Sequence, residues 1–107
     1  MSDPVTTFND SNFESEVLKS AVPTMVLFSA TWSGPCKYIV PVFDGIAVTY
    51  AGRARFSKVD VDESPITAKS LAINNVPAIR LFKSGKVVVT LGAVDKAQLT
   101  AALDANV

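Results

Sequence analysis

The chain contains no histidine and one cysteine, Cys36, among its 107 residues. Zinc sites built from cysteine and histidine are therefore excluded, as are the Ser-His-Asp and Cys-His forms of nucleophilic catalysis. One cysteine cannot form an internal disulfide, which excludes a small secreted scaffold held together by such bonds. No metal site is expected, and the carboxylates of Asp60 and Asp62 are expected to be solvated or to cap backbone N–H groups.

An excess of charge of either sign is also lacking, because 10 basic residues balance 10 acidic ones. This balance provides no electrostatic attraction for nucleic acid or for an anionic membrane. The apolar runs are far shorter than the ~20 residues that cross a bilayer, and the polar start of the chain lacks the apolar segment of a secretory signal. We therefore expect no nucleic-acid or membrane partner and a reducing compartment, which is the cytoplasm or an organelle whose transit peptide has been removed.

Length and composition predict a single domain over residues 1–107. With 49% hydrophobic and 19% charged residues, the chain has enough apolar side chains for a core and is too apolar to be disordered. No linker, repeat or low-complexity segment divides it. No long apolar stripe is left without a place in the predicted elements, so we expect a monomer.

Four segments have the pattern of β-strands. Residues 24–29 form a nearly continuous apolar run, which is typical of a central strand buried on both sides. Residues 55–61 alternate between apolar and polar side chains. Residues 78–83 and 86–91 flank Ser84-Gly85, which predicts a hairpin with a two-residue turn.

Four further segments are predicted to be helical. The first carries an apolar stripe that includes Phe13 and Val17, and the second starts near Gly34-Pro35. A short third helix covers about residues 66–71, and the last follows residue 95. The expected N-caps are Asn9 or Asp10 for the first helix, Ser64 for the third and Asp95 for the last.

The elements follow one another in the order β-α-β-α-β-α-β-β-α. The βαβ units require parallel strands joined by right-handed crossovers, whereas the closing hairpin is antiparallel. The predicted architecture is an α/β fold with a central mixed five-stranded sheet, made of three parallel strands plus a C-terminal antiparallel hairpin, and four helices on both faces.

The segment between the buried strand and the second helix reads Trp32-Ser33-Gly34-Pro35-Cys36-Lys37. It resembles the active-site motif of the thioredoxin family, Trp-Cys-Gly-Pro-Cys-Lys. The resemblance continues in the same order over nearly the whole chain and implies the thioredoxin fold. Further matching residues are Phe28, Pro41, Lys58-Val59-Asp60-Val61-Asp62, Val76-Pro77, Phe82-Lys83-Ser84-Gly85 and Gly92-Ala93.

The resemblance implies a protein-disulfide oxidoreductase whose redox centre consists of side chains, without a bound cofactor. A helix N-terminus stabilises a thiolate through its free amides and its dipole. The first cysteine of the motif attacks a substrate disulfide, and the second attacks the mixed disulfide and releases the reduced product. The implied partners are disulfide-containing substrate proteins and a thioredoxin reductase.

The chain departs from the family pattern at the attacking cysteine, where Ser33 stands. Serine has no sulfur for the mixed disulfide, so the dithiol–disulfide cycle should not be completed, although Cys36 is retained at the resolving position. Leu27 replaces a buried Asp that in the family assists proton transfer, and Ser29 occupies a position that is often Trp. In the family the charge of Lys58 lies near that Asp, so Leu27 also removes the partner of Lys58.

Pro77 matches the family's cis-proline, and the backbone of the residue before it, Val76, pairs in the family with an extended substrate segment. The resemblance therefore implies a shallow apolar docking patch beside Ser33 and Cys36. Its expected members are Trp32, Gly34, Pro35, Val76, Pro77, Gly92 and Ala93.

Three interpretations of Ser33 remain open. In the first, the natural form carries Cys at position 33 and is a thioredoxin-type reductase, and the serine is an engineered change that blocks turnover. In the second, the chain is a natural redox-inactive binding module that keeps the docking patch. In the third, Cys36 works alone with an external thiol such as glutathione. Serine also suits a helix N-cap, and an isolated Cys36 would suit a small buried apolar position.

Overall fold

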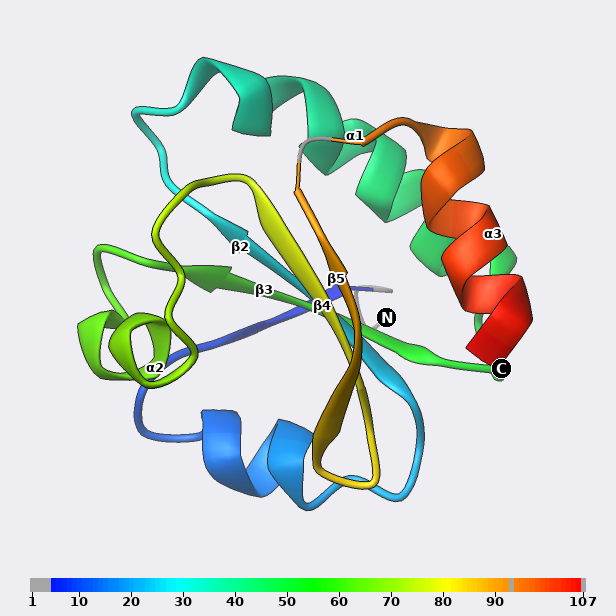
Figure 1. Ribbon diagram of the computed structural model, residues 1–107, viewed down its shortest axis with the longest axis horizontal. Coiled ribbons are helices and arrows are strands. Elements are labelled where there is room, and N and C mark those ends of the chain that lie inside the picture. Colours follow the sequence, from blue (N-terminus) through cyan, green and yellow to red (C-terminus); the bar gives the residue numbers. More distant parts are fainter. Residues whose placement is uncertain (1–4, 93, 107) are drawn as a thin grey trace.

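The computed structural model describes residues 5–92 and 94–106. A five-stranded sheet runs through the centre in the order β1-β3-β2-β4-β5 (Figure 1). β1, β3 and β2 are parallel, whereas β4 is antiparallel to β2, and β5 to β4. This confirms the predicted mixed sheet, and β1 is the strand of the predicted order to which no residues had been assigned. The strands are β1 (Val5–Phe8), β2 (Thr24–Ser29), β3 (Arg55–Asp60), β4 (Ala78–Lys83) and β5 (Lys86–Leu91).

Helices cover both faces of this sheet, as predicted (Figure 1). α1 (Gly34–Thr49) and α3 (Lys96–Asn106) lie on one face, and η1 (Glu14–Leu18) and α2 (Pro65–Ser70) lie on the other. η1 is a short π-helix, in which the N–H of Lys19 donates to the carbonyl of Glu14. No helix of the described residues is long and apolar enough to cross a membrane.

Strand β2 contributes side chains to the apolar cores on both faces. Met25 and Leu27 pack in the core beneath α1 and α3, whereas Val26 and Phe28 pack in the core that includes η1. All four side chains are completely buried. Because neither face of β2 meets water, its sequence shows an apolar run rather than an alternation.

Of the three side chains predicted to cap the first and third helices, those of Asp10 and Ser64 do not, because Asp10 caps a distant helix and the hydroxyl of Ser64 makes no cap bond. Asp10 does not cap η1, since its carboxylate accepts the backbone N–H groups of Ile66 at 3.2 Å and Thr67 at 2.8 Å, in the first turn of α2. Ser64 precedes α2, but its hydroxyl makes no cap bond and is buried without a partner among the described residues. Asn9, the other residue predicted for this cap, does cap the turns that lead into η1, because its Oδ1 accepts the N–H of Ser11 at 3.0 Å and its own N–H donates to Oδ1 of Asn12 at 2.8 Å.

The contacts with α2 also set the ionisation of Asp10. Desolvation of the carboxylate opposes its ionisation, but the hydrogen bonds from Thr67 and Ile66 outweigh this effect and lower the pKa of Asp10. The stability that this cap contributes is therefore present above the unfolded pKa near 3.8. It is lost as the pH falls through the lower pKa of the folded state.

The predicted cap of α3 and the predicted hairpin turn are confirmed. The carboxylate of Asp95 accepts the N–H of Gln98 at 2.9 Å, and the side chain of Gln98 accepts the N–H of Asp95 at 3.1 Å. Ser84 and Gly85 have φ angles of 53° and 79°. A Cβ at Gly85 would lie 2.8 Å from the carbonyl oxygen of Leu18, at the end of η1, so this turn requires glycine.

Candidate active site

One edge of the sheet gathers most of the predicted site residues. The parallel strands β2 and β3 end side by side there, with Ser29 opposite Asp60. β4 begins at the same edge because it is antiparallel, and Ala78 lies opposite Phe28. The loop 30–33 leads from β2 into α1, and Pro77 leads into β4. The register therefore brings the loop before α1 and the segment before β4 to one edge.

Ser33 occupies the N-cap position of α1 with an extended backbone, at φ −87° and ψ 119°. Its N–H donates to the carbonyl of Ala30 at 3.1 Å, and its side chain is buried, with 4% of the residue exposed. The hydroxyl makes no capping bond, so the side-chain cap that serine favours is absent here. The first N–H groups of α1 thus receive no side-chain oxygen from Ser33, and a helix start of this kind favours an anion.

Cys36 lies in the first turn of α1, three positions after Ser33 and on the same side of the helix. Its thiol is free and the residue is only 3% exposed. Ser33 and Cys36 therefore stand together at the start of one helix, where the first and second cysteines of a dithiol motif would stand.

A cleft of about 340 Å³ opens against Cys36, on the side of Ser29 and Asp60. The sequence did not predict this cleft, although the small residue Ser29 stands beside it. The signal for the cleft was that Ser29, a small residue, occupies a position that is often Trp in the family, so the volume of an indole is left unfilled. The residues that line the cleft are Ser29, Ala30, Thr31, Cys36, Lys37, Val40, Pro41 and Asp60.

Trp32 is 69% exposed, and its indole is held in place by a carboxylate. Nε1 of Trp32 donates to Oδ2 of Asp62 at 2.8 Å. Asp62 is exposed, in keeping with the expectation that it is solvated, and its contact with the indole was not predicted. Asp60 does cap, because its carboxylate accepts the N–H of Asp62 at 2.8 Å and that of Glu63 at 3.4 Å.

Two further grooves lie beside residues 32–35. The first, of about 210 Å³, has Trp32 and Val76 in its lining. The second, of about 310 Å³, has Pro35 and Pro77 in its lining. The Val76–Pro77 peptide bond is cis, as the resemblance implied. The structure thus brings together four members of the predicted docking patch that are distant in the sequence.

The remaining members of the patch line neither of these two grooves among the described residues. Gly34 is exposed directly before Pro35, and Gly92 is exposed after β5. Ala93 lies outside the described residues. Tyr38, which is 81% exposed and lines the second groove, was missed. The signal was an aromatic residue in the first turns of the helix but outside its apolar stripe.

The two supporting positions, Leu27 and Lys58, lie opposite each other in the register of β2 and β3. Leu27 is completely buried in the core beneath α1. Nζ of Lys58 lies 3.7 Å from Oδ1 of Asp44 in α1. The charge of Lys58 therefore has a partly exposed partner on the helix, in place of an acid at position 27.

A sequence model of the thioredoxin family matches residues 4–105. The chain belongs to the thioredoxin family. It is 48% identical to the thioredoxin of Acidithiobacillus ferridurans over 107 residues, which cover 99% of each chain. It is 45% identical to the thioredoxin of Allochromatium vinosum, over 98% of this chain and 99% of that one. It is 41% identical to the thioredoxin of Pseudomonas aeruginosa, over 100% of both chains.

Membership of the thioredoxin family confirms the fold that the resemblance implied. It also makes this chain a member of a family of disulfide oxidoreductases, which are redox proteins. The chain covers at least 99% of the length of each of these three thioredoxins.

Proposed function

We propose that this chain is a thioredoxin-type protein-disulfide oxidoreductase, formed by one domain, whose turnover is blocked at Ser33. The observation that carries the proposal is the position of Ser33 and Cys36, both nearly buried at the start of α1. The helix start supplies the amides and the dipole that lower the pKa of a thiol. The helix start on which a dithiol centre depends is present, but position 33 lacks the first of the two sulfurs.

With Cys at position 33, the chemistry would proceed in two exchanges. The thiolate at position 33 attacks one sulfur of the substrate disulfide, and the other substrate sulfur leaves as a thiolate that takes up a proton. The thiolate of Cys36 then attacks the sulfur at position 33, which releases the second substrate thiol and leaves a 33–36 disulfide. A thioredoxin reductase returns two electrons to that disulfide. The hydroxyl of Ser33 cannot form the first sulfur–sulfur bond.

The substrate is proposed to dock on the patch made of Trp32, Gly34, Pro35, Val76, Pro77, Gly92 and Ala93. The grooves beside Val76 and Pro77 support this assignment, because each of these two residues lines a groove together with apolar side chains. An extended substrate segment would pair with the backbone of Val76 in the manner of an added strand. The proposed partners are disulfide-containing proteins and a thioredoxin reductase, each bound by a monomer in the cytoplasm.

The change Ser33→Cys tests the proposal. The variant should reduce the disulfides of insulin when a thioredoxin reductase and NADPH are supplied, whereas the unchanged chain should not. The matched control is Ser33→Ala, which removes the hydroxyl without adding sulfur and should stay inactive. A folded Ser33→Cys variant that reduces no insulin would contradict the proposal.

A second candidate is a redox-inactive thioredoxin-like module that binds proteins. Leu27 favours it, because a completely buried leucine stands at the position of the proton-transferring acid, so a second catalytic feature is missing beside Ser33. The codon for position 33 in the natural gene separates the two candidates. A cysteine codon supports the blocked reductase, and a serine codon supports the binding module.

A further inference from the structure

Arg80 in β4 is a half-buried arginine without an acidic partner among the described residues. The two ion pairs of residues 5–92 and 94–106 involve other cations. Nη1 of Arg80 donates to the backbone carbonyls of Ile79 at 3.1 Å and Leu91 at 3.4 Å. A guanidinium has five N–H donors, so most of the donors of Arg80 are left for another acceptor.

Arg80 lines a pocket of about 290 Å³ between the loop that follows α2, the start of β4 and the end of β5. The other polar residues in its lining are Asn74, Asn75 and Thr90. Among the residues that the structure describes, none with a carboxylate side chain lines the pocket. Its charge is therefore positive and uncompensated, although the whole chain has a formal net charge of zero.

This pocket is continuous with the proposed docking patch. Pro77 lines both this pocket and the groove beside Pro35. Asn75 lines both this pocket and the groove beside Trp32 and Val76. A peptide that pairs with the backbone before Pro77 would therefore pass the mouth of the pocket and present side chains to it.

We propose that the Arg80 pocket is a specificity subsite that binds the carboxylate of an Asp or Glu side chain in the docked substrate segment. The inference rests on the proposed docking function and names the class of substrate that this patch prefers. A carboxylate fits because its two oxygens accept the parallel N–H donors of a guanidinium, in a bond stronger than one between neutral groups. A neutral Gln side chain in the same place keeps the shape but leaves the charge of Arg80 unpaired.

The test uses the unchanged chain and needs no turnover. Synthetic peptides carry one S-methylated cysteine, with Glu or Gln placed in turn at each position on either side of it. Binding is measured by the fluorescence of Trp32, the one tryptophan, which lies in the patch. At the favoured position the Glu peptide should bind about 5- to 10-fold more tightly than the Gln peptide at low salt, as for a partly buried charged hydrogen bond. This preference should shrink as NaCl is added.

Two variants locate the preference. Arg80→Gln should bring the affinities of the Glu and Gln peptides together. Lys86→Gln makes the same change of charge at the exposed, distant end of β5 and should leave the preference intact. If Arg80→Gln does not fold, Arg80→Lys replaces it, because the charge without the forked donors should reduce the preference and not abolish it.

Three results would overturn the inference. Equal affinities for every Glu and Gln pair in the unchanged chain would show that the Arg80 pocket is not a subsite for carboxylates. A preference for Glu that survives Arg80→Gln or high salt would show that the carboxylate binds at another place. In both cases the peptides still bind, so the docking function stands. Absence of binding by every peptide would refute the docking function itself, and the subsite with it.

Discussion

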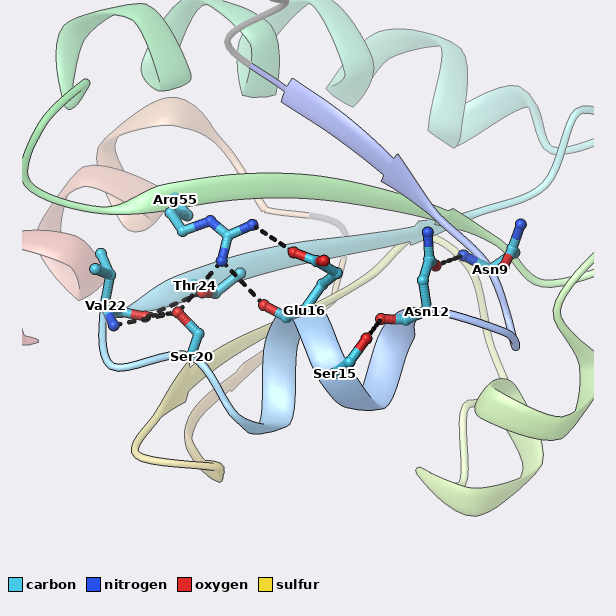
Figure 2. Close-up of polar contacts among 8 residues, drawn as sticks. All are labelled: Asn9, Asn12, Ser15, Glu16, Ser20, Val22, Thr24 and Arg55. Carbon is cyan, nitrogen blue, oxygen red and sulfur yellow. Dashed lines mark hydrogen bonds and ion pairs between the residues drawn. The ribbon is translucent and has the colours of Figure 1, made fainter.

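Strand β2 begins among tightly connected polar groups and ends beside open surfaces. At its start, Nη1 and Nη2 of Arg55 contact the carbonyl oxygen of Glu16 at 3.0 Å and its carboxylate at 3.3 Å (Figure 2). The hydroxyls of Ser20 and Thr24 both donate to the carbonyl of Val22, each at 3.0 Å. At the other end of β2 lie the cleft against Cys36 and the grooves of the proposed docking patch.

The two ends of β2 therefore differ in where their polar groups find partners. At the start of β2, side chains satisfy the loop carbonyls of the same chain, which stabilises the fold. At the far end, the exposed indole of Trp32 and the uncapped start of α1 leave contact area and backbone donors for another molecule. The fold tolerates these unfilled grooves because the contacts at the start of β2 and the two apolar cores stabilise the sheet.

The largest effect is expected from Leu27→Asp, which puts a charge inside β2 between its two ends. Lys58 lies opposite position 27 but already pairs with Asp44, so burial of this carboxylate should lower the free energy of unfolding by about 3–5 kcal/mol at neutral pH. Burial also raises the pKa of the new carboxyl group, so the loss should be smaller at pH 5 than at pH 8. Urea denaturation at both pH values measures this.

Leu27→Asn is the matched control, because it adds a polar group of similar size that does not titrate. It should be destabilised equally at both pH values. If the two variants show the same dependence on pH, the carboxyl group is not buried, and the placement of position 27 in the core is wrong.

A smaller effect is expected from Arg55→Ala at the start of β2. The variant loses the hydrogen bonds to Glu16 and the packing of the guanidinium over the ring of Phe8, 5.9 Å away. The expected loss is about 1–2 kcal/mol of unfolding free energy, measured by urea denaturation.

Glu16→Gln separates the ion pair from the rest of this contact. The side chains of Arg55 and Glu16 are 40% and 48% exposed, so solvent screens their attraction. The loss should stay below about 0.5 kcal/mol. A loss as large as that of Arg55→Ala would mean that the charge, and not the backbone contact, stabilises this end.

At the open end, Ser29→Trp should close the cleft and slow the alkylation of Cys36 by iodoacetamide several-fold. The cleft of about 340 Å³ has room for the larger side chain beside Cys36. Mass spectrometry of the alkylated chain measures the rate, and Ser29→Ala, which leaves the cleft open, is the control. Equal rates in both variants would show that reagents reach Cys36 by another route.

The same measurement on the unchanged chain tests the interpretation in which Cys36 works alone with an external thiol. If Cys36 is inert towards iodoacetamide there, that interpretation is removed.

The smallest effect is expected from Asp62→Ala, which removes the acceptor for the indole of Trp32. Because Trp32 is mostly exposed, the free energy of unfolding should change by less than about 0.5 kcal/mol. The tryptophan emission should nevertheless shift, since the indole N–H loses its protein partner. Asp62→Asn keeps an acceptor oxygen and should retain the original spectrum. An unchanged spectrum in Asp62→Ala would show that the contact does not persist in solution.

Local patterns in the sequence predicted most of the fold. The apolar run of 24–29, the turn at Ser84-Gly85 and the cap at Asp95 each depend on neighbours in the sequence, and each was placed correctly. β1 has only four residues, two of them threonine, which is too short for a periodic signal. Its place in the sheet depends on pairing with β3.

Contacts between distant residues account for what the sequence did not predict. Asp10 caps a helix that begins 55 positions later, so the rule that assigns a cap to the next helix failed. The indole of Trp32 meets Asp62, 30 positions away. The motif around Ser33 could be located because its residues are consecutive. The cleft and the Arg80 pocket could not, because each is formed by three segments that only the folded sheet brings together.

The glycine at the tip of the hairpin has a consequence for how this sequence can vary. The backbone of Leu18 occupies the space that any side chain at position 85 would need, whereas a Cβ at Gly34 or Gly92 would meet nothing within 4 Å. In a library that samples every amino acid at these three positions, selection for folded chains should retain glycine at 85 and admit alanine at the other two. The hairpin tip is thus a poor place to insert an epitope or to open a circular permutant.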